Sequence, residues 1–172
     1  MGGALRRLWA DVTLDARGGL IVVGSTATTV TAGADTLTPA GKSDAMLLRV
    51  SSGGVILGGT LLGGSENDAL LAIDSDGSSI VVGGYTEGDF SAGGMTLAPG
   101  GGRDGITMKL DPSDFSVTWA RRVGGADSQE VVGIGIDSLG RIDVAGSFRE
   151  TLDFGTLLTA GNSDGFVVQL SP

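Results

Sequence analysis

The segment Ser43-Asp44-Ala45-Met46-Leu47-Leu48-Arg49-Val50 decides the fold, because two later segments repeat its pattern. These counterparts occupy residues 103–110 and 163–170, and their aspartates, Asp104 and Asp164, follow Asp44 at two steps of 60 residues. After each aspartate, apolar residues occupy alternate positions, which is the period of a β-strand with one apolar face. A step this regular indicates a repeat protein.

Glycine pairs at residues 2–3, 63–64 and 124–125 open the three repeats, which we place at 2–62, 63–123 and 124–172. The first two repeats each contain four predicted strands. The third contains three, because the chain has no counterpart there of the strands predicted at 55–62 and 117–123. No segment has the pattern of an amphipathic helix, so the sequence predicts an all-β repeat protein.

The first two strands of each repeat are joined by a tight turn that begins with an aspartate and ends with a glycine. The turns begin at Asp15, Asp74 and Asp137. An aspartate can accept hydrogen bonds from its own turn, and glycine supplies the positive φ that such turns need. The second strands at 20–24 and 80–84 are continuously apolar, so we expect both of their faces to be covered by other sheets. In the third repeat Asp143 interrupts the pattern, and we expect its face to meet solvent.

Four antiparallel strands per repeat are typical of the blades of a β-propeller. The motifs that carry a family likeness are the Asp-x-x-Gly turn, the Gly-Ser or Gly-Tyr-Thr after the second strand, the strand at 163–170 and the strand around Trp119. Together they resemble the bacterial β-propeller repeat proteins of the seven-bladed β-propeller repeat type. The resemblance implies a propeller, brings no catalytic motif, and implies a family that is often extracellular or on the cell surface.

Three blades are too few for a closed ring, since propellers typically have about four to eight blades. An open end would leave strand edges and a sheet face exposed. We therefore expect either a homo-oligomer, in which a dimer supplies six blades, or the remaining blades of a longer protein. The competing fold is a β-solenoid, because the start of residues 63–70 partly matches a calcium-binding nonapeptide. Glu66 replaces a glycine of that motif and no nine-residue repetition follows.

Composition narrows the function classes. The net charge of −9, from 11 basic and 20 acidic residues, argues against nucleic acid and anionic membranes as partners. The chain has neither cysteine nor histidine, which removes disulfides, thiolate chemistry, the commonest general base and the commonest metal ligand. Its first residues have no signal-peptide pattern, and no apolar run approaches the ~18 residues of a membrane span.

Three sets of acidic residues are candidates for chemistry. Asp74-Ser75-Asp76-Gly77 has alternating oxygen ligands suited to Ca²⁺, but its counterparts lack the second aspartate, which favours a plain hairpin turn. Asp44, Asp104 and Asp164 could ring a mouth of the propeller and bind a ligand, yet their repetition favours turn capping. The same weighing applies to the three turn aspartates. The remaining glutamates are predicted to be solvating residues in connections: Glu66, Glu87, Glu130 and Glu150.

These observations favour a non-enzymatic β-propeller module for interaction or assembly. The alternative is a lectin-like module that binds carbohydrate or another small ligand in pockets between blades. A glycosidase or lyase that uses two carboxylates is the least favoured possibility, since such chemistry needs neither histidine nor cysteine. The sequence assigns no catalytic or metal-binding residue, predicts no cofactor and leaves the ligand-binding residues undetermined.

Overall fold

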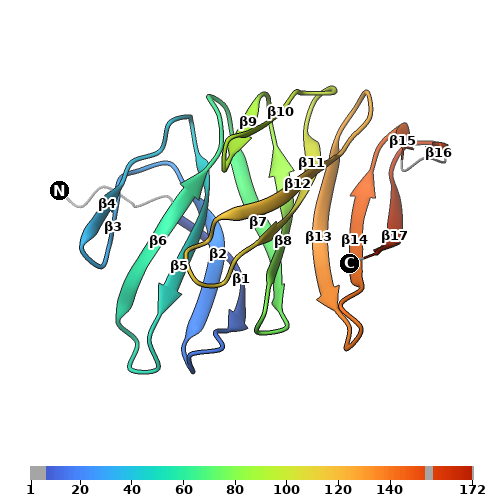
Figure 1. Cartoon of the computed structure of the whole chain (residues 1–172). Coiled ribbons are helices and arrows are strands. Elements are labelled where there is room, and N and C mark those ends of the chain that lie inside the picture. Colours follow the sequence, from blue (N-terminus) through green and yellow to red (C-terminus); the bar gives the residue numbers. More distant parts are fainter. Residues whose placement is uncertain (1–6, 154–156, 172) are drawn as a thin grey trace.

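The computed structural model of the protein describes residues 7–153 and 157–171, and these residues form β-strands and no helix. The predicted all-β class is therefore confirmed. Three larger antiparallel sheets stand side by side in chain order (Figure 1). Within the described residues no helix is long and apolar enough to cross a membrane. The glycine pair at 2–3 that opens the first repeat lies outside the described residues.

Each sheet is built from one predicted repeat, as neighbouring strands that run up and down. The first sheet has the order β1 (Arg7–Leu14), β2 (Leu20–Thr26), β5 (Asp44–Val50), β6 (Ile56–Leu62). The second has the order β7 (Asp68–Ser75), β8 (Ile80–Thr86), β11 (Asp104–Leu110), β12 (Val117–Val123). The third has three strands, β13 (Gln129–Ile136), β14 (Ile142–Phe148) and β17 (Asp164–Leu170). Each of these sheets has as many strands as the sequence predicts for its repeat.

The connection between the second and third strands of each repeat folds into a small hairpin, which the sequence analysis did not predict. The three hairpins are β3 (Val30–Ala32) with β4 (Asp35–Leu37), β9 (Phe90–Ala92) with β10 (Met95–Leu97), and β15 (Thr151–Asp153) with β16 (Leu157–Thr159). The strands β3 and β9 alternate buried and exposed residues, so the first two hairpins pack one apolar side onto their own repeats, and in β15 Leu152 is buried. Phe90, for example, is fully buried in the main core.

Apolar side chains fill the space between neighbouring sheets. Between the first and second sheets, Ile21 and Leu47 pack with Val82, Met108 and their neighbours in one buried cluster. Between the second and third sheets, Val81 packs with Val131, Val144, Phe166 and other residues in a second cluster. The residues facing the two sides of the second sheet are adjacent in sequence, which explains the continuous apolar run of β8.

The prediction that both faces of the second strand are covered is confirmed for β8 and wrong for β2. The outer face of the first sheet is covered only in part among the described residues. Met46 and Leu48 are buried there beneath the β3–β4 hairpin, whereas Leu20 is 38% exposed and Trp9 is 47% exposed. The expectation for Asp143 is confirmed, because this residue is exposed and accepts a hydrogen bond from Gln169 at 2.8 Å. The stack of sheets thus ends in an apolar face at the first sheet and a more polar face at the third.

Candidate functional site: a polar pocket between the second and third sheets

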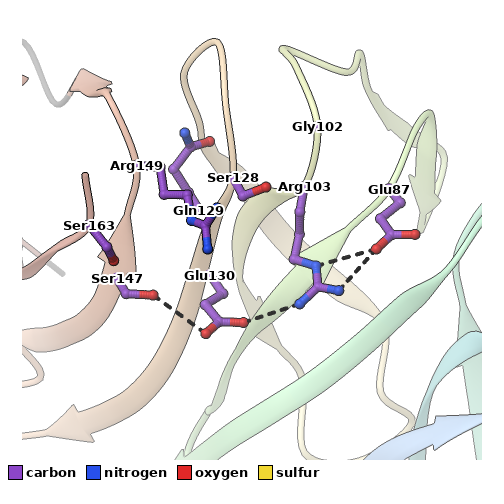
Figure 2. Close-up of a pocket in the computed structure, with 9 residues that line it drawn as sticks. All are labelled: Glu87, Gly102, Arg103, Ser128, Gln129, Glu130, Ser147, Arg149 and Ser163. Carbon is purple, nitrogen blue, oxygen red and sulfur yellow. Dashed lines mark hydrogen bonds and ion pairs between the residues drawn. The ribbon is translucent and has the colours of Figure 1, made fainter. Parts of the chain in front are cut away.

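A pocket of about 670 Å³ opens between the second and third sheets, at the end where β8 and β14 finish and β11, β13 and β17 begin (Figure 2). This volume lies within the range of small-molecule sites. Charged and hydroxyl side chains dominate its lining: Glu87, Gly102, Arg103, Ser128, Gln129, Glu130, Ser147, Arg149 and Ser163. The pocket is therefore suited to a polar ligand.

Two backbone hydrogen bonds hold this end of the molecule in place, the first between the second and third sheets and the second within the third repeat. The Gln129 amide donates to the Arg103 carbonyl at 2.7 Å, and the Arg149 amide donates to the Ser128 carbonyl at 2.9 Å. The same two bonds recur one repeat earlier: the Asp68 amide donates to the Ser43 carbonyl between the first and second sheets, and the Glu87 amide donates to the Asn67 carbonyl within the second repeat. The backbone hydrogen bonds at the pocket thus recur from one repeat to the next, whereas the side chains that line it do not.

Arg103 lies at the centre of a charged network that spans the two sheets. Its guanidinium donates to Glu87 Oε1 at 3.0 Å and to Glu130 Oε2 at 3.4 Å, and it lies 3.8 Å from the centre of the Tyr85 ring. On the other side of Glu130, the Ser147 hydroxyl approaches Oε1 at 3.4 Å (Figure 2). Two carboxylates and an aromatic ring hold this guanidinium, so Arg103 is fixed between the sheets.

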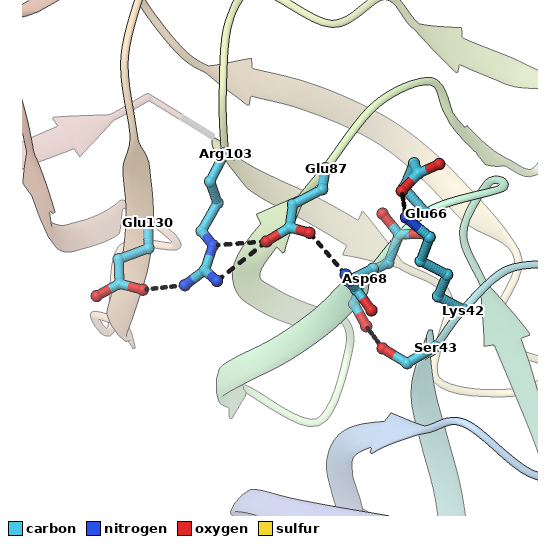
Figure 3. A network of polar contacts seen from close by, with 8 residues as sticks. Lys42, Ser43, Glu66, Asp68, Glu87, Arg103 and Glu130 are labelled. Carbon is cyan, nitrogen blue, oxygen red and sulfur yellow. Dashed lines mark hydrogen bonds and ion pairs between the residues drawn. The ribbon is translucent and has the colours of Figure 1, made fainter.

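The network continues toward the first sheet through Glu87 (Figure 3). Asn67 donates to Glu87 Oε2 at 2.7 Å. This hydrogen bond, with the guanidinium of Arg103 as a further cause, holds the pKa of the Glu87 carboxyl below its usual range. Glu87 is therefore ionised at neutral pH and serves the site as an acceptor. Beyond it, Lys42 and Glu66 form a solvent-exposed ion pair.

We predict that replacing Asn67 with alanine raises the pKa of Glu87 toward the ordinary value for a glutamate. A carboxyl whose pKa is lowered by folding adds stability above its unfolded pKa and loses it as the pH falls through the folded pKa. The variant should therefore lose less stability than the parent protein in that acidic window. A ¹³C NMR titration of the carboxyl resonance measures the pKa directly, and an unchanged pKa would contradict the assignment to Asn67.

Arg149 is the cation of the pocket that has no anionic partner. Its side chain is exposed and makes no hydrogen bond or ion pair within the part of the chain that the structure describes. Nor do the hydroxyls of Ser128 and Ser163 find a partner among those residues. The pocket thus presents one unused guanidinium beside unused hydroxyl groups.

The candidate aspartates at the strand starts divide by role. Asp44 accepts hydrogen bonds from the amides of Ala40 and Gly41, and Asp104 accepts one from Gly100. For these two, the prediction of turn capping is confirmed. Asp104 also forms an ion pair with Arg122 of β12 at 3.1 Å. Asp164 is exposed, and its carboxylate accepts the amide of the adjacent Gly165.

The first-strand aspartates do not share one role either. Asp15 and Asp137 begin their turns as predicted, since each carbonyl accepts the amide of the turn glycine three residues later. Asp74 instead lies inside β7, and its carboxylate accepts the Ile136 amide of the third sheet at 2.8 Å. The prediction that Asp74 begins a turn is wrong, because Asp74 and Ser75 still pair with β8 and the strand ends only at Ser75.

The possible calcium loop is an ordinary turn in this structure. One carboxylate oxygen of Asp76 accepts the amides and hydroxyls of Ser78 and Ser79 at 2.7 to 3.2 Å. These bonds occupy the oxygen that a cation would need and lower the pKa of Asp76 despite its partial desolvation. Among the described residues no three acidic side chains come together as a metal site.

A buried pair of carboxylates bears on the enzyme hypothesis. Asp44 and Asp68 both flank Gly63, and they are 3% and 0% exposed. Burial, with the charge of Asp44 as a further cause, raises the pKa of Asp68, and its Oδ1 has no hydrogen-bond partner among the described residues. The catalytic carboxylates of a glycosidase must contact the bound sugar. Since this pair is closed to solvent, we assign it a structural role.

Replacing Asp68 with asparagine should stabilise the protein by about 1 kcal/mol at pH 7, because an amide removes a buried charge beside Asp44. Gln129, the counterpart of Asp68 in the third sheet, shows that the site accepts an amide: its Oε1 accepts the Gly125 amide as Asp68 Oδ2 accepts that of Gly64. A carboxyl with a raised pKa weakens the fold as the pH rises through that window, so the gain should vanish at low pH. Urea denaturation at pH 7 and at low pH measures the change in the free energy of unfolding. A loss of stability at pH 7 would contradict this prediction.

From the sequence, Glu87 and Glu130 are predicted to be solvating residues, and Arg103 has no predicted role. The structure brings these three side chains together, although they belong to three separate segments. A usable signal was present in the departure from the repeat. Position 103 is serine in the other two repeats, and position 130 corresponds to Ala69 in the second repeat.

No family model matches the chain. The chain is similar to the regulatory protein FlaEY of Caulobacter vibrioides, with 34% identity over 113 residues, which is 64% of this chain and 12% of that protein. The chain therefore spans about an eighth of the length of this bacterial relative.

Proposed function

We propose that the three sheets are blades of a β-propeller and that the chain is a non-enzymatic interaction and assembly module. Two molecules of the chain would join their open ends and complete a ring of six blades. The resemblance to bacterial propeller repeats supports this proposal, as does the face-to-face order of the sheets. In a longer protein such as the regulatory relative, further blades of the same chain would occupy the same open ends.

One observation carries the proposal: two positions of the repeat are buried where they lie between sheets, but the side chains at these positions are exposed on the outer face of the first sheet. Trp9, Leu70 and Val131 hold the same place opposite a glycine of the second strand, and they are 47%, 0% and 0% exposed. Leu20 is 38% exposed, whereas its counterpart Ile80 is fully buried. The first sheet therefore presents an interface of the kind used twice inside the chain, without a partner.

The edge of the third sheet supports the same conclusion. In the second sheet β12 pairs with β11, and Arg122 of β12 reaches Asp104. In the third sheet β17 has no strand on that side among the described residues, and Asp164 occupies the place of Asp104. An added strand would satisfy the open backbone groups of β17. An arginine opposite Phe166, as Arg122 lies opposite Ile106, would bring a cation to Asp164.

The test is the mass of the protein in solution, measured by light scattering during size-exclusion chromatography. We expect twice the chain mass of 17.1 kDa. Leu20→Lys should weaken the dimer at least about 100-fold, because each of two equivalent interfaces loses about 1.5 kcal/mol or more of apolar burial. Leu139→Lys is the matched control, since Leu139 is 70% exposed in the turn between β13 and β14.

A stable monomer at high concentration would contradict self-association of this chain. Equal weakening by both lysine substitutions would contradict the assignment of the interface to the outer face of the first sheet. Unfolding curves of both variants show whether the monomer fold is intact, which separates a loss of association from a loss of structure.

A further inference from the structure

We propose that the pocket between the second and third sheets binds a small sugar acid, with the carboxylate of the ligand on Arg149 and its hydroxyls on the surrounding serines and Glu130. This inference goes beyond the assembly role. It does not depend on ring closure, because the pocket is lined entirely by residues of one chain.

The size and lining of the pocket select the class of ligand. About 670 Å³ is ample for a monosaccharide or a disaccharide, and the lining contains no aromatic side chain. The ring of Tyr85 lies outside this lining and carries the guanidinium of Arg103 on one face at 3.8 Å. A sugar in this pocket would therefore be held by hydrogen bonds and charge more than by stacking.

The charges of the pocket select an acid over a neutral sugar. Arg103 already forms ion pairs with both Glu87 and Glu130. Arg149 remains as an exposed guanidinium with no ion pair among the described residues, and a guanidinium binds a carboxylate through two parallel hydrogen bonds. Two carboxylates and two guanidinium groups line the pocket, so their formal charges sum to zero, in a chain whose overall charge is −9. A carboxylate ligand would pair with Arg149, the guanidinium that no carboxylate of the pocket engages.

The neutral groups around Arg149 suit the remainder of such a ligand. Ser128 and Ser163 have unused hydroxyls, and Ser147 shares its hydroxyl with Glu130 across a long contact of 3.4 Å. Serine hydroxyls donate and accept, and a carboxylate accepts only, so the set can pair with several hydroxyls of one sugar ring. A plain anion such as acetate would leave these groups without partners.

The interface between the first and second sheets lacks the charged side chains of this pocket. The pocket is therefore not a feature that every repeat shares. The place of Arg149 is held there by Glu87, whose carboxylate is engaged by Asn67 and Arg103. The place of Glu130 is held by Ala69. The backbone hydrogen bonds are the same at both interfaces, so the two differ in their side chains.

The test is isothermal titration calorimetry of the full chain with glucuronate and galacturonate, using glucose, galactose and acetate as comparison ligands. We expect the sugar acids to bind at least about tenfold more tightly than any comparison ligand. Arg149→Gln should weaken the binding of the sugar acids at least about tenfold, since a charge-assisted hydrogen bond is removed. Arg17→Gln makes the same charge change at an exposed residue outside this pocket and should leave the affinity unchanged.

Absence of heat with both uronates at 10 mM and above would overturn the inference. Equal binding of neutral sugars, or equal binding of acetate, would overturn the assignment to sugar acids. Because unfolding curves report whether Arg149→Gln keeps its fold, a lost fold is distinguishable from a lost site. Failure here leaves the mass of the assembly unaffected, and failure of the assembly leaves this titration unaffected.

Discussion

Replacing Asp15 with alanine should lower the free energy of unfolding by about 3–5 kcal/mol, because it leaves a buried guanidinium without its counterion. Arg49 and Asp15 form an ion pair at 2.6 Å, with side chains only 8% and 3% exposed. The guanidinium also donates to the Pro112 carbonyl and lies 4.8 Å from the centre of the Phe115 ring. The pair thus links a turn of the first sheet to the loop between β11 and β12 of the second.

Urea denaturation measures this loss, and two further variants give it meaning. Lys42→Ala removes one partner of an exposed ion pair, with side chains 64% and 41% exposed, and should cost at most about 1 kcal/mol. The double variant Asp15→Ala with Arg49→Met should recover part of the loss, because the unpaired charge is no longer present. If Asp15→Ala costs no more than Lys42→Ala, the buried pair does not hold the sheets together.

Replacing Gly84 with alanine should cost about 3 kcal/mol or more, since the new methyl group has no room. A Cβ at this position would lie 1.9 Å from the Ala69 carbonyl oxygen, which is backbone and cannot rotate away. The cause is a β-bulge in β7, where the register shifts between Leu70 and Ala72 and the backbone presses onto β8. The third sheet has the same bulge, and a Cβ at Gly146 would lie 2.1 Å from the Glu130 carbonyl oxygen.

Gly135→Ala is the matched control for this prediction. Gly135 also lies in a strand, β13, but a Cβ there meets no atom within 4 Å. Its replacement should change the free energy of unfolding by no more than about 0.5 kcal/mol. Similar losses for the two variants would mean that strand propensity, and not the close approach at the bulge, accounts for the effect of Gly84→Ala.

The strands themselves were predictable because their signals are local. Alternating apolar residues after Asp44, Asp104 and Asp164 specify β5, β11 and β17 within one residue of their observed starts. The small hairpins were not predicted, since strands of three residues carry too few positions for a period of two to be visible. The turn at Asp74 was misplaced for a related reason: a second aspartate two residues later offers the same turn chemistry.

The candidate site was less predictable than the fold. Glu87, Arg103, Glu130 and Arg149 come from four segments that meet only when the second and third sheets pack against each other. None belongs to a motif with a fixed spacing, and each taken alone has the sequence context of a surface residue. Comparing the repeats with one another exposes them as departures, but it does not show that the departures face the same cavity.

The sequence by itself determined the repeat length of 60 residues, the all-β class and most of the strands. It could do so because side-chain alternation and turn chemistry act between residues that are close in the chain. Only the tertiary structure decided which copies of a repeated position are buried. Leu20 and Ile80 occupy the same place in the pattern, yet one is exposed and the other is covered. The difference is made by the neighbouring sheet, and stacking of sheets is a property of the whole chain.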